Sequence, residues 1–381
     1  MRTAKRLDTV QEYYFSKKLR EVAALRAQGK SIINLGIGSP DLAPPPSVIE
    51  ALKKATNNNA AHQYQPYKGI TELRNAISGF YKKFYNLNLD PDSEILPLMG
   101  SKEGIMHISM TFLNPGDEVL LPDPGYPTYT AVSKLLDATE RKYELRAENN
   151  WLPDLDQLGK EDLSKVKIMW VNYPNMPTGA IASDDFFKKL TNFAETHKIL
   201  VVNDNPYSFI QNDQPKSILQ NNGLSDYVME LNSLSKSFNM AGWRVGILAG
   251  SEKNINSVLK VKSNMDSGMF YPVQVGAVEA LKLSGSWFDE INKVYKRRKK
   301  KMLELISALD CEVKDEQAGL FIWAKTPEKK TSGDLVDDLL YDKDIFVTPG
   351  FIFGAQGEGY VRFSLCSTVE VINEAIKRIK R

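Results

Sequence analysis

The spacing of hydrophobic residues differs between the middle of this chain and its flanking parts. Between about residues 94 and 250, short apolar runs alternate with longer segments whose apolar positions recur every three or four residues. The short runs predict buried strands and the longer segments predict helices. Strands that alternate with helices predict a mostly parallel sheet covered on both faces. The predicted strands are 94–99, 118–121, 167–171, 199–204, 227–231 and 245–249, and predicted helices begin near Lys102, Tyr126 and Ser183.

The residues on either side of this region carry a different pattern. Residues 9–28 have helical spacing and 32–35 form a short apolar run, while 71–85 are again helical. A long helical pattern over 286–309 is followed by predicted strands near 319–325 and 360–364, and by helices near 333–341 and 370–380. We therefore expect an α/β protein with a three-layer large domain over residues 45–285. A smaller α+β domain is expected from residues 1–44 and 286–381.

Composition narrows the possible chemistry. The chain has 381 residues, of which 42% are hydrophobic and 25% charged, as in ordinary soluble proteins. The net charge of +2 argues against general attraction to nucleic acid or anionic lipid. Two cysteines and three scattered histidines disfavour a disulfide framework and zinc chemistry, so we expect a cytoplasmic protein without a metal site. Demanding chemistry must then use an organic cofactor, or Ser, Lys, Asp and Tyr side chains.

Neither a targeting signal nor a membrane span is expected. The opening residues lack the apolar stretch of a signal peptide, and no run of about 18 apolar residues occurs. A basic run over 296–301 is the best candidate for nucleic-acid binding, but it lies inside a predicted helix. A solvated helix face explains it better, because no helix-turn-helix segment precedes residue 30.

The strongest chemical signal directly follows the predicted strand 227–231. The segment contains Ser233, Ser235 and Lys236, and Arg244 follows eight residues after the lysine. Ligands of parallel sheets bind beyond the carboxyl ends of the strands. In that place a lysine amine can attack an aldehyde while the hydroxyls and the guanidinium hold a phosphate. A lone lysine is ordinarily a surface cation, and only the Ser-x-Ser-Lys setting favours a Schiff-base site.

Other segments end at the same predicted sheet edge. Asp204 and Tyr207 follow a strand that is apolar on both faces, and a carboxylate there could pair with a protonated pyridine nitrogen. Residues 100–104 join a strand to a helix, where backbone N–H groups and the helix dipole can bind phosphate. Tyr126 could stack on a ring. The plainer alternatives are that Asp204 caps a turn and that Tyr126 only packs.

Together these segments resemble the fold type I, class I and II aminotransferases that depend on pyridoxal 5'-phosphate. The resemblance runs from about Ile32 to Ser364, with the motifs in the family's order. It implies that Lys236 binds the cofactor covalently and moves the substrate proton, with Asp204 on the pyridine nitrogen and Tyr207 on the ring hydroxyl. The other implied roles are phosphate binding by Ser101, Lys102, Ser233, Ser235 and Arg244, ring stacking by Tyr126, contact with the neighbouring subunit's phosphate by Tyr64, and binding of the substrate carboxylate by Arg362 and Gly36. A homodimer with shared active sites follows from the role of Tyr64.

One position departs from the family pattern. The family usually has Asn-Pro-Thr-Gly where this chain has Met176 before Pro177. That asparagine touches the ring hydroxyl and the substrate carboxylate, and methionine cannot donate either hydrogen bond. Asn175 is the candidate replacement for both contacts, with Asn172 as the alternative.

The resemblance implies ping-pong transamination between an amino acid and a 2-oxo acid. Relatives that bind dicarboxylates commonly use a second arginine, and this chain has none between Arg244 and Arg297, so neutral donors are expected. Tyr13, Tyr14 and Phe15 could form a flap over the substrate, or merely an apolar helix face.

Two rival functions stay open on the sequence. A β-elimination lyase, such as a cysteine–sulfur lyase, would share Lys236, Asp204 and Arg362. A non-catalytic protein that binds pyridoxal phosphate is left possible by Met176.

Overall fold

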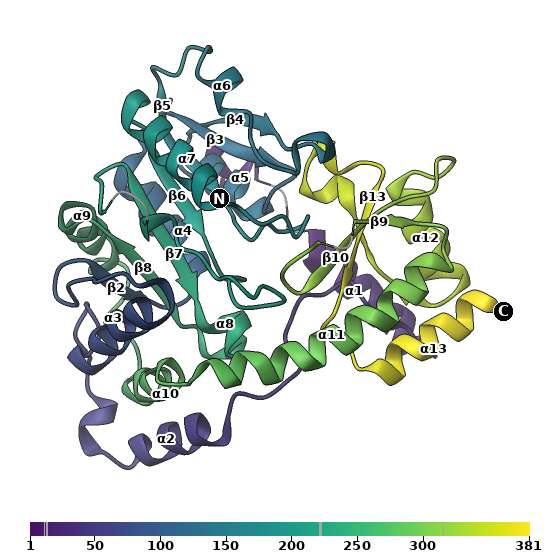
Figure 1. The fold of residues 1–381 in the computed structure, drawn as a ribbon, viewed down its shortest axis with the longest axis horizontal. Helices are drawn as coiled ribbons and strands as arrows, with labels where there is room; N and C mark the ends of the chain where they lie inside the picture. The colour runs from purple at the N-terminus through teal and green to yellow at the C-terminus, as the bar shows by residue number, and fades with distance from the viewer. Residues whose placement is uncertain (11, 13, 221–222, 315) are drawn as a thin grey trace.

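A central sheet forms the body of the molecule (Figure 1). The computed structural model describes residues 1–10, 12, 14–220, 223–314 and 316–381. Within them the sheet has the strand order β2-β8-β7-β6-β5-β3-β4. The strands are β2 (Ile95–Leu98), β3 (Glu118–Asp123), β4 (Thr139–Glu144), β5 (Val166–Val171), β6 (Leu200–Asp204), β7 (Val228–Ser233) and β8 (Gly246–Gly250).

Most neighbours in this sheet are parallel, as predicted. β4, β3, β5, β6 and β7 run the same way, while β8 is antiparallel to both β7 and β2. Successive residues of β6 point to opposite faces: Val201 belongs to one hydrophobic core and Val202 to the other. Both faces must therefore be covered, which explains why the strands read as continuous apolar runs.

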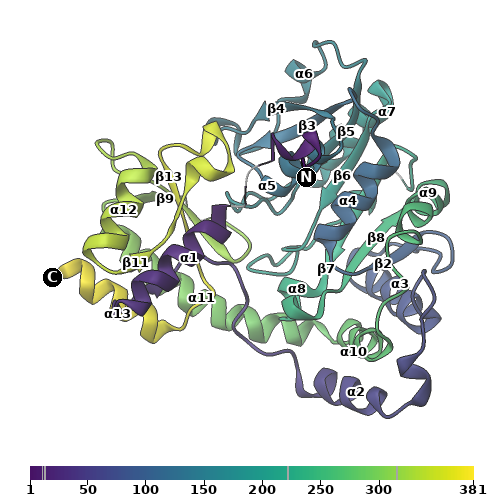
Figure 2. The ribbon, with the colours of Figure 1, turned by 180° about the vertical axis from the view of Figure 1, so that it is seen from behind.

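Helices supply that cover. One face carries α4, α5 and α9, seen in front of the sheet in Figure 2. The remaining helices of this part pack on the other face or around the edges. The bounds are α2 (Pro46–Thr56), α3 (Thr71–Tyr85), α4 (Ser101–Phe112), α5 (Pro127–Leu135), α6 (Leu155–Leu158), α7 (Asp184–His197), α8 (Leu234–Ser237), α9 (Glu252–Lys262) and α10 (Tyr271–Leu281).

The smaller part gathers both ends of the chain around a second sheet. Its strand order is β12-β13-β10-β9, all antiparallel, and β1 pairs separately with β11 in parallel. The long helix α11 runs from the large part to the small one and packs on α13 (Figure 1). The elements are α1 (Tyr14–Ala27), β1 (Ile33–Asn34), α11 (Gly285–Ser307), β9 (Glu312–Val313), β10 (Phe321–Lys325), α12 (Ser332–Asp342), β11 (Ile345–Phe346), β12 (Thr348–Pro349), β13 (Tyr360–Ser364) and α13 (Val369–Lys380).

The first residues do not follow α1 into the small part. The short 3₁₀ helix η1 (Lys5–Leu7) contacts α5 of the large part. None of the described helices is long and apolar enough to cross a membrane.

A buried acid joins α3 to the sheet. Glu230 is fully buried on β7 and accepts hydrogen bonds from the Tyr81 hydroxyl (2.9 Å), the Asn205 amide (3.3 Å) and the backbone N–H of Ile218 (3.2 Å). Burial nevertheless raises the pKa of Glu230 to about 7. Since the folded state holds this proton more tightly than the unfolded chain does, the carboxyl group destabilises the fold progressively as pH rises from about 4.5 to 7.

Replacing Glu230 by glutamine should remove this dependence. The variant's amide group can face the Tyr81 hydroxyl, which can accept as well as donate. We expect the stability of the wild type relative to E230Q to fall by on the order of 1–3 kcal/mol between pH 5 and pH 8. Urea unfolding midpoints of both proteins across this range measure it, with exposed Glu195→Gln as the control. A difference that stays constant with pH would contradict the assignment.

Candidate active site

A cavity of about 650 Å³ lies at the carboxyl ends of β6 and β7, facing the small part. Residues of both parts of the molecule line it. The lining includes ten residues selected from the sequence: Ser101, Lys102, Tyr126, Asp204, Tyr207, Ser233, Ser235, Lys236, Arg244 and Arg362.

Asp204 ends β6 with one carboxylate oxygen unused. Its Oδ2 accepts a hydrogen bond from the Tyr129 hydroxyl at 2.8 Å, while Oδ1 is buried without a hydrogen-bond partner. Burial raises the pKa of this carboxyl to about 7. An unpartnered buried carboxylate oxygen is costly unless a donor meets it. A protonated ring nitrogen is such a donor.

Lys236 lies on α8, directly after β7. Its Nζ donates to the Gly38 carbonyl at 2.6 Å, and the residue is only partly accessible from the cavity. Burial, with smaller contributions from the Arg362 and Arg244 cations, lowers the pKa of this amine to about 8. A substantial share of the amine is therefore neutral near pH 8, which is the form that attacks an aldehyde.

The part of the cavity near Gly100 and Arg244 can bind an anion. Gly100 has φ of +96° and precedes the first turn of α4, and a Cβ on it would come within 2.2 Å of Arg244 Nη2. A Cβ on Gly246 would come within 2.6 Å of the Ser101 backbone nitrogen. These glycines let the guanidinium approach the start of α4, where N–H groups and the helix dipole favour a phosphate.

Arg362 lies on β13 in the small part of the molecule and is 4% exposed. The Phe321 ring lies 3.8 Å from its guanidinium carbon, and the Phe353 ring 4.8 Å. Its Nη2 donates to the Gly36 carbonyl at 2.8 Å, and its Nη1 contacts the sulfur of Met176 at 3.2 Å. The predicted departure at Met176 thus places a thioether beside this arginine.

Three of the predicted residues do not line the cavity. Gly36 lies outside the lining, and its carbonyl accepts a hydrogen bond from Arg362. Asn175 is buried in its own turn, where Oδ1 accepts from the N–H and the hydroxyl of Thr178. Asn172, the alternative, lines the cavity and donates to the Asp204 carbonyl.

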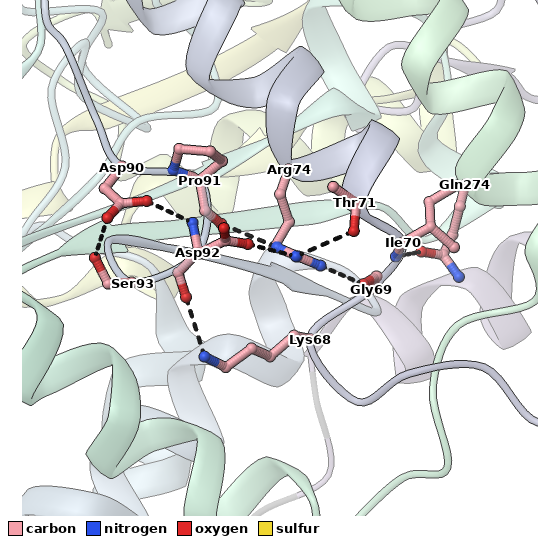
Figure 3. A network of polar contacts seen from close by, with 10 residues as sticks. All are labelled: Lys68, Gly69, Ile70, Thr71, Arg74, Asp90, Pro91, Asp92, Ser93 and Gln274. Atoms are coloured by element: carbon pink, nitrogen blue, oxygen red, sulfur yellow. Dashed lines mark hydrogen bonds and ion pairs between the residues drawn. The ribbon is translucent and has the colours of Figure 1, made fainter.

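Tyr64 is the third, and its side chain is 90% exposed in the single chain. It lies on the loop between η2 (Asn59–His62) and α3. A polar network fixes the later part of this loop (Figure 3). Arg74 donates to the Gly69 carbonyl and to Asp92, both at 2.7 Å, and Gln274 accepts from the Ile70 N–H at 2.8 Å.

Sequence reasoning missed Tyr129 and the phenylalanines around Arg362. Tyr129 lies one helical turn after Tyr126, so helical spacing could have placed both rings on the same side of α5. Phe321 and Phe353 come from distant segments that meet Arg362 only in the folded chain. Of the proposed flap, Phe15 lines the cavity and Tyr14 packs against Phe15 and Phe351, while Tyr13 is outside the described residues.

Known proteins resemble this chain over nearly its whole length, in sequence and in fold. The family model for aminotransferase class I and II matches residues 30–379. The chain belongs to the class I and II aminotransferases. An LL-diaminopimelate aminotransferase of Dehalococcoides mccartyi is 41% identical over 381 residues, covering 100% of this chain and 98% of that relative. The structure of apo-BacF from Bacillus subtilis has a TM-score of 0.96 and 35% identity, covering 100% of this chain and 98% of the other.

Membership of this family makes the protein an enzyme that depends on pyridoxal phosphate and moves an amino group between an amino acid and a 2-oxo acid. The cavity fits that cofactor in three places: the unused oxygen of Asp204, the amine of Lys236 and the anion site at the start of α4. The expected fold class is confirmed as well.

Proposed function

We propose that this aminotransferase takes its amino groups from α-amino acids with neutral, apolar side chains. The surroundings of Arg362 carry this proposal. Besides Phe321 and Phe353, the Phe15 ring lies 5.3 Å from its guanidinium carbon, and Leu19 and Ile37 also line the cavity. Such a wall favours apolar groups and gives no compensation to a buried charge.

The charged groups of the lining support the same conclusion. Its cations are Lys102, Lys236, Arg244 and Arg362, and its one carboxylate is Asp204. Each has a role in the arrangement proposed here, with Arg362 gripping the α-carboxylate of the substrate. No further charged side chain of the lining then remains for a second carboxylate or a distal ammonium.

The roles of the other residues follow from their positions. Pyridoxal phosphate, when bound, supplies an aldehyde for the lysine and a ring that accepts electrons from the substrate Cα. The Lys236 amine would hold the cofactor at its aldehyde carbon, with release of water, and once free would carry the proton that leaves Cα. Asp204 accepts a hydrogen bond from the ring nitrogen and so keeps that nitrogen protonated. We assign Tyr207 to hydrogen bonding with the ring hydroxyl, and Tyr126 to stacking on the ring face.

Phosphate binding and substrate orientation complete the assignment. Ser101, Lys102, Ser233, Ser235 and Arg244 hold the phosphate. Asn172 takes the position facing the cofactor that the sequence interpretation gave to Asn175.

Arg362→Lys tests the carboxylate grip. A guanidinium binds a carboxylate through two parallel hydrogen bonds, which an ammonium cannot reproduce. Lysine would also lose the stacking on Phe321. We expect KM for the amino donor to rise by about 10- to 100-fold, with cofactor content unchanged, in steady-state kinetics. A KM equal to that of the wild type would contradict the assignment.

A second candidate donor is LL-diaminopimelate, favoured by the name of the relative that is 41% identical over the whole chain. This substrate carries an ammonium and a carboxylate at its far end. Both would have to remain in water or find partners outside the described lining.

A panel of donors decides between the two. The cofactor-loaded enzyme is mixed with L-phenylalanine, L-methionine, L-leucine, L-alanine, L-glutamate or LL-diaminopimelate, and the bleaching of its visible absorbance band is timed. We expect a bulky neutral donor to have the highest ratio of rate to apparent KM. Faster conversion by LL-diaminopimelate would replace the first candidate by the second.

We also propose a homodimer in a reducing, cytoplasmic environment. The exposure of Tyr64 on a firmly held loop suits a side chain that reaches the phosphate site of a second copy. Cys311 and Cys366 are both free thiols, which suits a reducing compartment. Analytical ultracentrifugation, and loss of cofactor affinity in Tyr64→Ala, test the dimer.

A further inference from the structure

Three potential metal-ligand residues lie close together at α4 and do not line the active-site cavity. Glu103 and His107 lie one turn apart on α4, and Asp266 lies in the segment after α9. One ligand atom from each lies within 4.8 Å of the others. His107 Nε2 is 3.7 Å from Glu103 Oε1, too far for a hydrogen bond. This cluster plays no part in the chemistry proposed above.

Four polar atoms of this cluster are buried without a hydrogen-bond partner. His107 is 1% exposed, and both of its ring nitrogens are buried without a hydrogen bond. Oε2 of Glu103 and Oδ2 of Asp266 are likewise buried and unpaired. Buried polar groups are rarely left in this state, because each costs free energy. One nitrogen and two carboxylate oxygens thus lie within 4.8 Å of one another, near enough to be drawn onto a single ion.

Lys262 contacts this cluster but does not pair all of its polar atoms. Lys262 Nζ binds Asp266 Oδ1 at 2.9 Å and the Tyr67 carbonyl at 2.9 Å, which leaves Oδ2 of Asp266 unused. With a neutral imidazole, the two carboxylates and the ammonium sum to −1. A divalent ion would change that sum to +1, so the buried charge is no larger in magnitude.

We propose that Glu103, His107 and Asp266 form a binding site for a divalent transition-metal ion of the zinc class. Zinc accepts imidazole and carboxylate ligands and completes four-coordination with a water molecule. Magnesium prefers oxygen ligands in an octahedron, so the imidazole selects against it. The bound ion would connect α4, whose first turn carries Ser101 and Lys102, to the segment that leads into α10. Occupancy should therefore stabilise the folded chain.

The test uses cofactor-loaded protein, stripped of metal with a chelator and then dialysed. Titration calorimetry with zinc chloride, and with magnesium chloride in parallel, measures affinity and stoichiometry. The thermal unfolding midpoint is measured with and without zinc. We expect one zinc ion per chain, a raised midpoint, and weaker binding of magnesium.

Matched variants decide whether the binding belongs to this cluster. His107→Leu should weaken zinc binding about 10-fold or more, and Glu103→Gln should also weaken it while keeping the imidazole and a side chain of nearly the same shape. The control is His62→Ala, which removes an exposed imidazole and should bind zinc as the wild type does. The proposal is overturned if the wild type binds no zinc, or if both cluster variants bind it as tightly as the control.

Discussion

Lys236→Ala should lose the amino-transfer half-reaction almost completely. The variant keeps the anion site and Asp204, so pyridoxal phosphate can still bind without a covalent bond. It lacks both the amine that attacks the aldehyde and the base that moves the Cα proton. Because positioned acid–base groups contribute about 10²–10⁴-fold each, we expect a rate at least about 10⁴-fold below that of the wild type.

Single-turnover absorbance with an excess of amino donor measures this loss. Borohydride reduction followed by peptide mass analysis should find the cofactor mass on the peptide that contains Lys236 in the wild type, and nowhere in the variant. Lys260→Ala, on α9 and outside the cavity lining, is the control and should react normally. Unaltered turnover in Lys236→Ala would remove this lysine from the mechanism.

Asp204→Asn should have the second largest effect. The asparagine keeps the size of the side chain, and its amide oxygen can still accept from Tyr129. It cannot form the ion pair with a protonated ring nitrogen. A buried carboxyl whose pKa is about 7 can hand its proton to that nitrogen and remain as its counterion, which asparagine cannot do. We expect the half-reaction to slow by about 10²–10³-fold and cofactor binding to weaken.

Stopped-flow kinetics and equilibrium dialysis of the cofactor separate these two effects. Tyr129→Phe is the matched comparison, because it removes one hydrogen bond to Asp204 and keeps the carboxyl group. It should slow the reaction far less. If Asp204→Asn reacts as fast as Tyr129→Phe, the negative charge has no part in the chemistry.

Much of the large part could be predicted from hydrophobic spacing. Strands buried on both faces contain short apolar runs, such as residues 200–202 of β6, and the helix predicted over 71–85 is α3 itself. Ser183 caps the start of α7, near the predicted helix start, since its side chain accepts from the Phe186 N–H. The edge strand β4 was missed because it is mostly exposed and reads Thr-Glu-Arg-Lys-Tyr-Glu, without an apolar run.

Most parts of the site that the sequence located lie near strand ends, whereas Arg362 lies inside β13 and was assigned only from the resemblance to the family. Asp204 and the residues after β7 lie where a parallel sheet presents its ligands, so local pattern was enough. The sequence could not separate Asn175 from Asn172, because the difference depends on a hydrogen bond within one turn. There the Thr178 hydroxyl donates to the side-chain oxygen of Asn175. The Glu103–His107–Asp266 cluster escaped detection since Asp266 is distant from the other two in sequence, and the composition had suggested no metal site.

The most direct test of the central claim is a stoichiometric half-reaction. The cofactor-loaded enzyme is mixed with L-phenylalanine, with no 2-oxo acid present, and both the absorbance band and the released product are quantified. The account predicts one equivalent of 2-oxo acid per active site, a bleached band, and its return when a second 2-oxo acid is added. The result that would contradict it is no bleaching by any amino donor, or continuous release of ammonia and pyruvate from cysteine conjugates with no amino transfer to a 2-oxo acid.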